Sequence, residues 1–342
     1  TVRGTKRDAQ QALREALGDR DRGVLIVGDP PTLGEWLPQW LQQHATDRDL
    51  AETTVVRYER VIRLGLLPVL GHARLDELGP QHFIAYQTAE SITPDNRTRG
   101  IKLVKRALAD AVIAGVIGRN PAQSIRSQKV RRRAERRALS DDEVRVLLQT
   151  AAGTSYWTPL ALAVTTGLRQ GELLALTWDD MELDLQRFTV HRGLRVIPGR
   201  GVQIAPAKTK NAVRTIEVSE RMTALLRKHR VTQQETRLRL GQRWQANDFV
   251  FPSGVGTVWS PSNFYRGYRA IVGRSGLDRP ATITFHTLRH TAATQQIRVT
   301  KDIHLVSRRL GHSSAAFTMD TYGHLLPGTQ RVAAEALDHV IG

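Results

Sequence analysis

The sequence predicts a mainly α-helical protein with a small antiparallel β-sheet, divided between a helical domain and a larger mixed domain. Three observations lead to this prediction. The 342 residues exceed what one ordinary hydrophobic core accommodates. Apolar residues recur at helical spacing along most of the chain. Short strand-like runs, separated by the turn sequences PGRG and KTKNA, gather between residues 187 and 218.

The first section, residues 1–31, contains one amphipathic helical pattern. Ala9, Leu13, Ala16 and Leu17 share one face of it. One helix cannot bury its own apolar face, so this segment is either a linker helix or the remnant of a truncated domain.

The second section, residues 32–127, reads as a four-helix domain. Thr32 with Glu35 three residues later predicts a capped helix start. Pro38 predicts a kink or an early break in that first helix, and Gly65 and Pro68 should stop the second. The helical patterns cover residues 32–44, 51–72, 79–89 and 96–122.

A basic segment, residues 128–137, follows. It holds six basic residues opposed only by Glu135: Lys129, Arg131, Arg132, Arg133, Arg136 and Arg137. It is interpreted as a linker lying along a nucleic-acid backbone, the alternative being a solvated linker. The third section, residues 138–342, opens with Ser140 capping a helix and Glu143 completing the box. Strands follow at 187–197, 201–207 and 213–218, and helices resume from Ser219.

The charge balance indicates a polyanionic partner. Lys and Arg outnumber Asp and Glu by 50 to 33, giving a formal net charge of +17. DNA or RNA is the expected partner, and an Arg-rich composition without such a partner is the alternative. In the second section the candidate phosphate contacts are Arg57, Arg60, Arg63, Arg97, Arg99, Lys102, Lys105 and Arg106, each of which could equally be a solvated surface charge.

The absence of cysteine excludes disulfides, zinc–thiolate sites and thiol catalysis. No apolar run approaches the length needed to span a membrane, and no signal peptide is recognisable. A cytoplasmic protein without a membrane partner is expected.

Two short motifs place charged residues three apart on expected helices. Arg169 and Glu172 should share a face, so that Glu172 can orient Arg169 or cap the helix. His286 and Arg289 could direct an imidazole and a guanidinium at one anion. Taken alone, each pair could be a surface contact. His290 is interpreted as a structural core residue.

Two further motifs lie near the end of the chain. His312 follows a glycine in LGHSS, and Tyr322 lies ten residues later in TYGHL. A single tyrosine is far more often a packing residue than a nucleophile, so the case for Tyr322 depends on the other motifs.

The order of these motifs resembles that of the tyrosine recombinase, or phage integrase, family. The segments TGLRQGELLAL, AKTKNAVRTI, HTLRHTAAT, LGHSS and TYGHL each resemble a family motif. The second section, with VLGH and GVIGRNPA, resembles the family's core-binding domain, and the first resembles the end of its arm-binding domain. Many relatives have His-Asp-Leu-Arg where this chain has Thr287 second, which is not a catalytic position in the family.

The resemblance implies a clamp of core-binding and catalytic domains around DNA, and a set of catalytic roles. Arg169 and Arg289 would hold non-bridging phosphate oxygens, with Glu172 in support, and His312 would add a donor. Tyr322 would be the nucleophile. Lys208, with Lys210 as the alternative, would protonate the leaving 5′ oxygen, and His286 would help deprotonate Tyr322 or position the phosphate.

The product implied is a 3′-phosphotyrosine link and a free 5′ hydroxyl, formed at DNA attachment sites without metal, ATP or cofactor. A homotetramer on DNA is expected, with a DNA-bending host factor and a directionality factor as possible partners, at the nucleoid of a bacterial host. A C-terminal helix with Val332, Ala333, Leu337, Val340 and Ile341 on one face would pack on a neighbouring protomer or on its own domain. The alternative functions are type IB topoisomerase-like relaxation, DNA binding without chemistry, and a metal-dependent nuclease.

Overall fold

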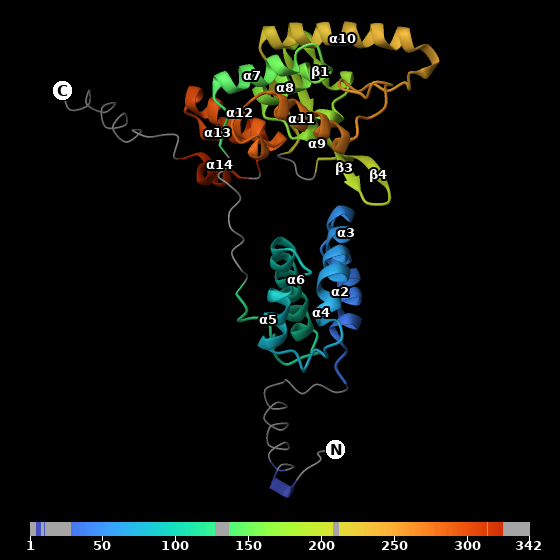
Figure 1. Ribbon diagram of the computed structural model, residues 1–342, viewed down its shortest axis with the longest axis vertical. Coiled ribbons are helices and arrows are strands. Elements are labelled where there is room, and N and C mark those ends of the chain that lie inside the picture. Colours follow the sequence, from blue (N-terminus) through green and yellow to red (C-terminus); the bar gives the residue numbers. More distant parts are fainter. Residues whose placement is uncertain are drawn as a thin grey trace, which may run out of the picture. The chain divides into compact units, whose positions relative to one another are not determined.

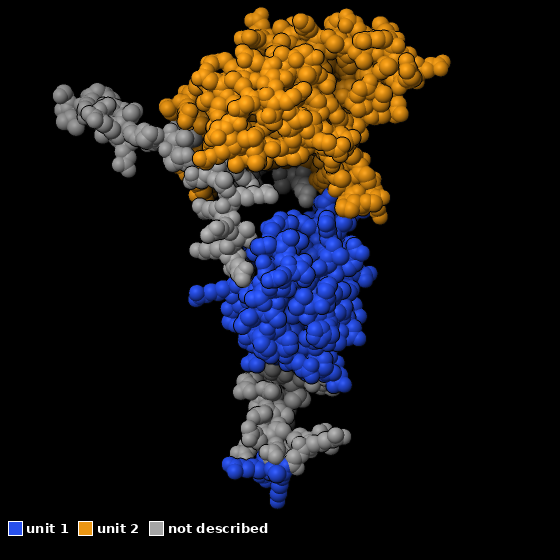
Figure 2. All heavy atoms as spheres, viewed as in Figure 1, with its two compact units in different colours: residues 1–132 blue, residues 133–342 orange. Residues whose placement is uncertain are grey.

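The computed structural model describes residues 5–7, 10, 29–126, 137–207, 212–312 and 314–323. The chain divides into two compact units, residues 1–132 and 133–342, coloured separately in Figure 2. Each unit has its own buried apolar core. The predicted first-section helix, the basic linker apart from Arg137, and the predicted C-terminal helix lie outside the described residues, except for isolated positions near the start.

The described part of the first unit is a helical bundle (Figure 1). Thr32 and Glu35 form the predicted capping box, in which the Glu35 carboxylate accepts from the Thr32 backbone at 2.8 Å. The helices are α2 (Leu33–Asp47), α3 (Glu52–Val61), the π-helical turn η1 (Ile62–Leu66), α4 (Leu67–Leu70), α5 (Pro80–Thr88) and α6 (Pro94–Ile113).

Neither the early break predicted at Pro38, as the alternative to a kink, nor the stop predicted at Gly65 and Pro68 occurs. Helix α2 continues through Pro38 to Asp47, because a proline in the second turn removes only one backbone hydrogen bond while the buried apolar stripe continues. Gly65 and Pro68 do not stop the second helix either. The wide turn η1, closed by the Leu67 N–H donating to the Ile62 carbonyl, connects α3 directly to α4.

The core of the first unit requires one glycine on α6. The Tyr86 ring, fully buried, extends from α5 against α6 at Gly100. A Cβ atom at Gly100 would lie 2.0 Å from the Tyr86 hydroxyl oxygen, so no larger residue fits without displacing the ring.

The second unit combines its helices with two small sheets rather than the one predicted. The three-stranded sheet has the order β1-β2-β5, and β3 and β4 pair separately, all antiparallel. The chain leaves the first sheet at His191, so the expected strand at 187–197 is two strands. The strands are β1 (Met181–Glu182), β2 (Arg187–Val190), β3 (Arg192–Ile197), β4 (Gly201–Pro206) and β5 (Arg214–Glu217).

The last three helices of the second unit, in chain order, pack against one another near the end of the described chain. The predicted capping box of Ser140 and Glu143 is present. None of the described helices is long and apolar enough to cross a membrane. The helices are α7 (Asp141–Ala151), α8 (Trp157–Thr166), α9 (Gln170–Ala175), α10 (Glu220–Leu240), α11 (Pro261–Arg274), α12 (Phe285–Thr300), α13 (Ile303–Leu310) and α14 (Ala315–Tyr322), with 3₁₀ turns η2 (Trp178–Asp180), η3 (Leu183–Leu185), η5 (Gly241–Arg243) and η6 (Pro280–Thr282).

Candidate active site

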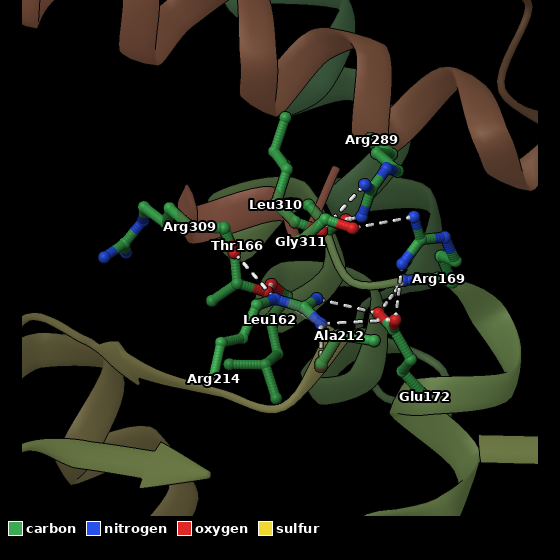
Figure 3. A network of polar contacts seen from close by, with 11 residues as sticks. Leu162, Thr166, Arg169, Glu172, Ala212, Arg214, Arg289, Arg309, Leu310 and Gly311 are labelled. Atoms are coloured by element: carbon green, nitrogen blue, oxygen red, sulfur yellow. Dashed lines mark hydrogen bonds and ion pairs between the residues drawn. The ribbon is translucent and has the colours of Figure 1, made fainter. Parts of the chain in front are cut away.

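Three guanidinium groups bind three consecutive backbone carbonyls at the C-terminal end of α13 (Figure 3). The last carbonyls of a helix have no partner within the helix and carry its negative dipole end, so they attract cations. The three pairs are Arg214 Nε with the Arg309 carbonyl at 2.8 Å, Arg289 with the Leu310 carbonyl at 2.8 Å, and Arg169 with the Gly311 carbonyl at 3.2 Å.

Each arginine comes from a different element. Arg169 is the N-cap residue of α9, Arg214 opens β5, and Arg289 lies in the second turn of α12. A second nitrogen of Arg289 donates to the carbonyl of Gly167, which ends α8 in the left-handed conformation, at 2.8 Å. The Arg289 guanidinium is therefore fixed between the ends of α8 and α13.

Glu172 is the carboxylate that joins this cluster. It accepts from the Arg169 backbone N–H at 2.9 Å and from the Arg169 guanidinium at 2.7 Å, so it caps α9 and orients the side chain, as the spacing predicted. It also pairs with Arg214 at 2.8 Å. Burial alone would raise the pKa of Glu172, but its contacts with Arg214 and Arg169 hold that pKa below the ordinary value. Three guanidiniums and one carboxylate leave two uncompensated positive charges.

The arginines differ in exposure. Arg289 and Arg214 are buried, with 2% and 8% of their surfaces exposed, whereas 43% of the Arg169 side chain is exposed. Burial, followed by the nearby charge of Arg169, lowers the pKa of Arg289 to about 9. The Arg289 guanidinium is therefore still charged at neutral pH. Because the guanidinium is buried, it attracts strongly an anion that binds there and displaces water.

We expect Glu172→Gln to lower the free energy of unfolding by about 3 kcal/mol at pH 7, because it leaves the buried Arg214 without its counter-charge. The folded-state pKa of Glu172 is depressed, so its stabilisation is present above its unfolded pKa and is lost as pH falls through the folded value. The difference between the two proteins should therefore shrink in acid. Urea unfolding at pH 7 and below pH 4 measures it; an equal difference at both values would contradict the assignment.

His312 lies directly after the left-handed Gly311 that ends α13. Its Nδ1 is 2.7 Å from the hydroxyl of Thr318, a fully buried residue of α14. Burial, followed by the charges of Arg289 and Arg169, lowers the pKa of His312 to about 4. His312 is therefore neutral at pH 7.

Tyr322, the last residue of α14, is 5% exposed and packs with Ala293, Ile297 and Leu310. Its hydroxyl lies 2.5 Å from Nδ1 of His290. The interpretation of His290 as a structural core residue did not anticipate this contact with the predicted nucleophile.

His286 is exposed, and its ring meets that of His290 edge to face at 4.8 Å. The residue that the structure places directly against Tyr322 is thus His290, not His286. The signal for it in the sequence was its spacing: His286 and His290 are four residues apart and share a face of α12.

Sequence reasoning also missed Arg214 and Thr318. Arg214 was part of a strand pattern, and nothing in that pattern distinguishes a strand arginine at the surface from one directed into a cluster. Lys208 and Lys210, in the link between β4 and β5, lie outside the described residues.

The basic residues predicted to contact DNA in the first unit have different environments. Arg97 and Lys105 donate to backbone carbonyls of α5 and of the segment after α6, at 2.6 and 3.1 Å, so they hold α6 in place. Arg99 pairs with Asp95 at 2.7 Å. Arg57, Arg60 and Lys102 are exposed. Arg131, Arg132 and Arg133 lie outside the described residues.

No group of three or more His, Asp or Glu that could hold a metal ion occurs within the part of the chain that the structure describes. The cationic cluster instead offers a site for an anion.

Comparisons with known proteins identify the family. Residues 137–328, more than half of the chain, match the model of the phage integrase family, and residues 32–90 match that of the phage integrase N-terminal SAM-like domain. The chain therefore belongs to the phage integrase family. It is 27% identical to the Tyrosine recombinase XerC-like protein of Caldanaerobacter subterraneus subsp. tengcongensis, over 98% of this chain and 90% of that one. It is 26% identical to an integrase of Streptomyces ambofaciens, over 98% and 87%.

Solved structures share the fold. The Tn1549 transposon integrase in complex with a circular intermediate DNA gives a TM-score of 0.75 at 18% identity, covering 90% of this chain and 99% of that one. A lambda integrase dimer bound to a COC′ core site gives 0.62 at 20% identity, covering 89% and 80%.

Proposed function

We propose that this protein is a site-specific DNA recombinase that cuts and rejoins duplex DNA through a phosphotyrosine at Tyr322, integrating or excising a mobile element. The observation that carries the proposal is the cluster of Arg169, Arg214 and Arg289 beside a buried tyrosine. Integrase and recombinase relatives that match over almost the whole chain support it.

The cluster suits a phosphodiester. Arg169 and Arg289 bind its two non-bridging oxygens and stabilise the negative charge that grows on them, while Arg214 and Glu172 hold Arg169 in position. Each such donor contributes on the order of 10²–10³ in rate. Where the Thr318 hydroxyl donates to Nδ1 of neutral His312, the ring proton is on Nε2, which then donates to a phosphate oxygen.

The reaction conserves bond energy. The Tyr322 oxygen forms a bond to phosphorus as the bond to the 5′ oxygen breaks, giving a 3′-phosphotyrosine and a free 5′ hydroxyl. Lys208 supplies the proton to the leaving oxygen, with Lys210 as the alternative donor. The reverse attack by a 5′ hydroxyl rejoins the strand, so no ATP is consumed. Two uncompensated positive charges repel a divalent cation, and the proposed chemistry uses none.

The remaining parts have proposed roles in the assembly. Residues 32–127 form the core-binding domain, in which the exposed Arg57, Arg60 and Lys102 contact phosphates, and residues 138–342 form the catalytic domain. Arg97, Arg99 and Lys105 already bind groups of the protein, so they would favour DNA binding through their positive charge while those contacts remain. The basic segment 128–137 follows the DNA backbone. The net charge of +17 supports these contacts.

Four protomers would act together on paired attachment sites in the bacterial cytoplasm, at the nucleoid. Support comes from a lambda integrase structure, described as a tetramer bound to a Holliday junction, which shares the fold at a TM-score of 0.60. A DNA-bending host protein and a directionality factor would complete the assembly.

The test is capture of the covalent intermediate. The protein is incubated in EDTA with nicked duplex DNA from beside its own gene, and SDS gels are followed by protease digestion and mass spectrometry. A nucleotide attached to Tyr322 is expected. Attachment at another residue, or none despite sequence-specific binding in a gel shift, would overturn the proposal; plasmid relaxation without any preferred site would indicate a topoisomerase.

A further inference from the structure

Three aromatic rings form a row from the buried nucleophile to the surface. The Tyr322 hydroxyl lies 2.5 Å from Nδ1 of His290, and the His290 ring meets the His286 ring at 4.8 Å. Tyr322 is 5% exposed, His290 is partly buried and His286 is exposed. The row therefore connects a buried phenol to solvent through His290.

Helix α12 produces this arrangement because successive residues turn by about 100° around a helix. Arg289 points to the carbonyls of Gly167 and Leu310, while His290, the next residue, points to α14 and contacts Tyr322. One helix thus positions both a phosphate-binding group and the partner of the nucleophile.

A tyrosine hydroxyl ionises near pH 10 in water, so at neutral pH its proton must be taken as it attacks. An imidazole nitrogen in hydrogen-bond contact is suited to take it. The contact requires no rearrangement of Tyr322, because the acceptor is already within 2.5 Å.

We propose that His290 is the proton acceptor for Tyr322, a proposal that rests on Tyr322 being the nucleophile. In the step, the Tyr322 O–H bond breaks, the proton goes to Nδ1 of His290 to give an imidazolium, and the electron pair forms the bond to phosphorus. The 5′ oxygen leaves with a proton from another group. His290 thus takes the role that the family resemblance suggested for His286.

Charged and titratable groups of the described chain lie around the pair. His286 lies on the same helix, His312 precedes α14, and the Arg289 charge interacts with Tyr322. The positive charge of Arg289 favours the phenolate, so it promotes transfer to His290.

The test uses His290→Asn, because the side-chain oxygen of asparagine can take the place of Nδ1 as a hydrogen-bond acceptor but cannot accept a proton. In the wild-type protein, where an acceptor for the phenol proton is present, single-turnover adduct formation on the nicked DNA should rise with pH and level off below the range in which phenol itself ionises. In His290→Asn the rate at pH 7 should fall by about 10²-fold or more and keep rising toward the range in which phenol itself ionises.

The matched control is His286→Asn, one turn away on the same face of α12. It should keep the wild-type rise and plateau with pH even if its rate is lower. Thermal unfolding and gel shifts show whether each variant folds and binds DNA. A wild-type pH profile in His290→Asn would overturn the inference, as would loss of the plateau in His286→Asn alone.

A second measurement needs neither DNA nor a His290 variant. Nitrogen NMR of ¹⁵N-histidine-labelled protein should show the His290 Nδ1 resonance shifting between wild type and Tyr322→Phe, with His286 changing less. An unchanged His290 resonance would overturn the contact on which the inference depends. An adduct that forms on Tyr322 while His290→Asn behaves as wild type defeats this inference alone; an adduct elsewhere defeats the proposed function.

Discussion

Replacing Tyr322 with Phe is expected to abolish the covalent protein–DNA adduct, with a loss of cleavage rate of at least about 10⁴-fold. The reason is that the Tyr322 hydroxyl is the proposed attacking group, and it lies near enough to Arg289 to interact with its charge. The ring remains in its apolar cluster and the hydroxyl contact with His290 is lost, so stability should change by about 1 kcal/mol.

Tyr268→Phe is the matched control. Tyr268 is also buried in the second unit, and its hydroxyl donates to the Thr284 carbonyl at 3.2 Å. It should lose a similar amount of stability and keep the adduct. Single-turnover cleavage measures adduct formation, gel shifts measure DNA binding, and thermal unfolding measures stability. An adduct that survives in Tyr322→Phe would assign the nucleophile to a different residue.

The second large effect is expected for Arg289→Lys, which keeps the charge but not the planar fork. The guanidinium binds the carbonyls of Gly167 and Leu310 with separate nitrogens, and a single ammonium cannot reproduce that geometry while also facing a phosphate. Adduct formation should fall by about 10²–10³-fold, and stability by about 1–3 kcal/mol, because a buried carbonyl loses its donor.

Arg298→Lys, an exposed position in the last turn of the same helix, should change neither quantity. Cleavage at saturating protein, which separates the chemical step from DNA binding, provides the measurement. Wild-type cleavage by Arg289→Lys would show that its charge alone is required and that the fork is not.

Much of the candidate site could be predicted from the sequence, because its residues occur in short motifs at helical spacing. Arg169 with Glu172 is an example, since a separation of three places both on one side of a helix start. Arg214 could not be found in this way: its neighbours follow a strand pattern, and its partners lie 42 residues before it and 95 after it. Such partners meet only through the tertiary fold.

The fold was predicted with similar limits. Capped helix starts at Thr32 and Ser140 were recognisable because the capping residues are adjacent in sequence. The continuation through Pro68 was not, because it depends on a π-helical turn at Ile62–Leu66 whose hydrogen bonding has no simple sequence signal. The contact of His290 with Tyr322 was not predicted, because its neighbours in sequence are apolar and the contact comes from α14.

The carbonyls that receive the three arginines belong to the backbone of Arg309, Leu310 and Gly311, and this limits what mutagenesis can detect. An alanine scan would identify each guanidinium as important. It would leave the three carbonyls that position the guanidiniums unchanged, since no side-chain replacement deletes a main-chain oxygen. Gly311 is the exception: its φ of +68° disfavours other residues, and a Cβ there would lie 2.9 Å from an Arg214 nitrogen. Exchanging the amide after Leu310 for an ester would make the Leu310 carbonyl a weaker acceptor for Arg289 and leave every side chain unchanged.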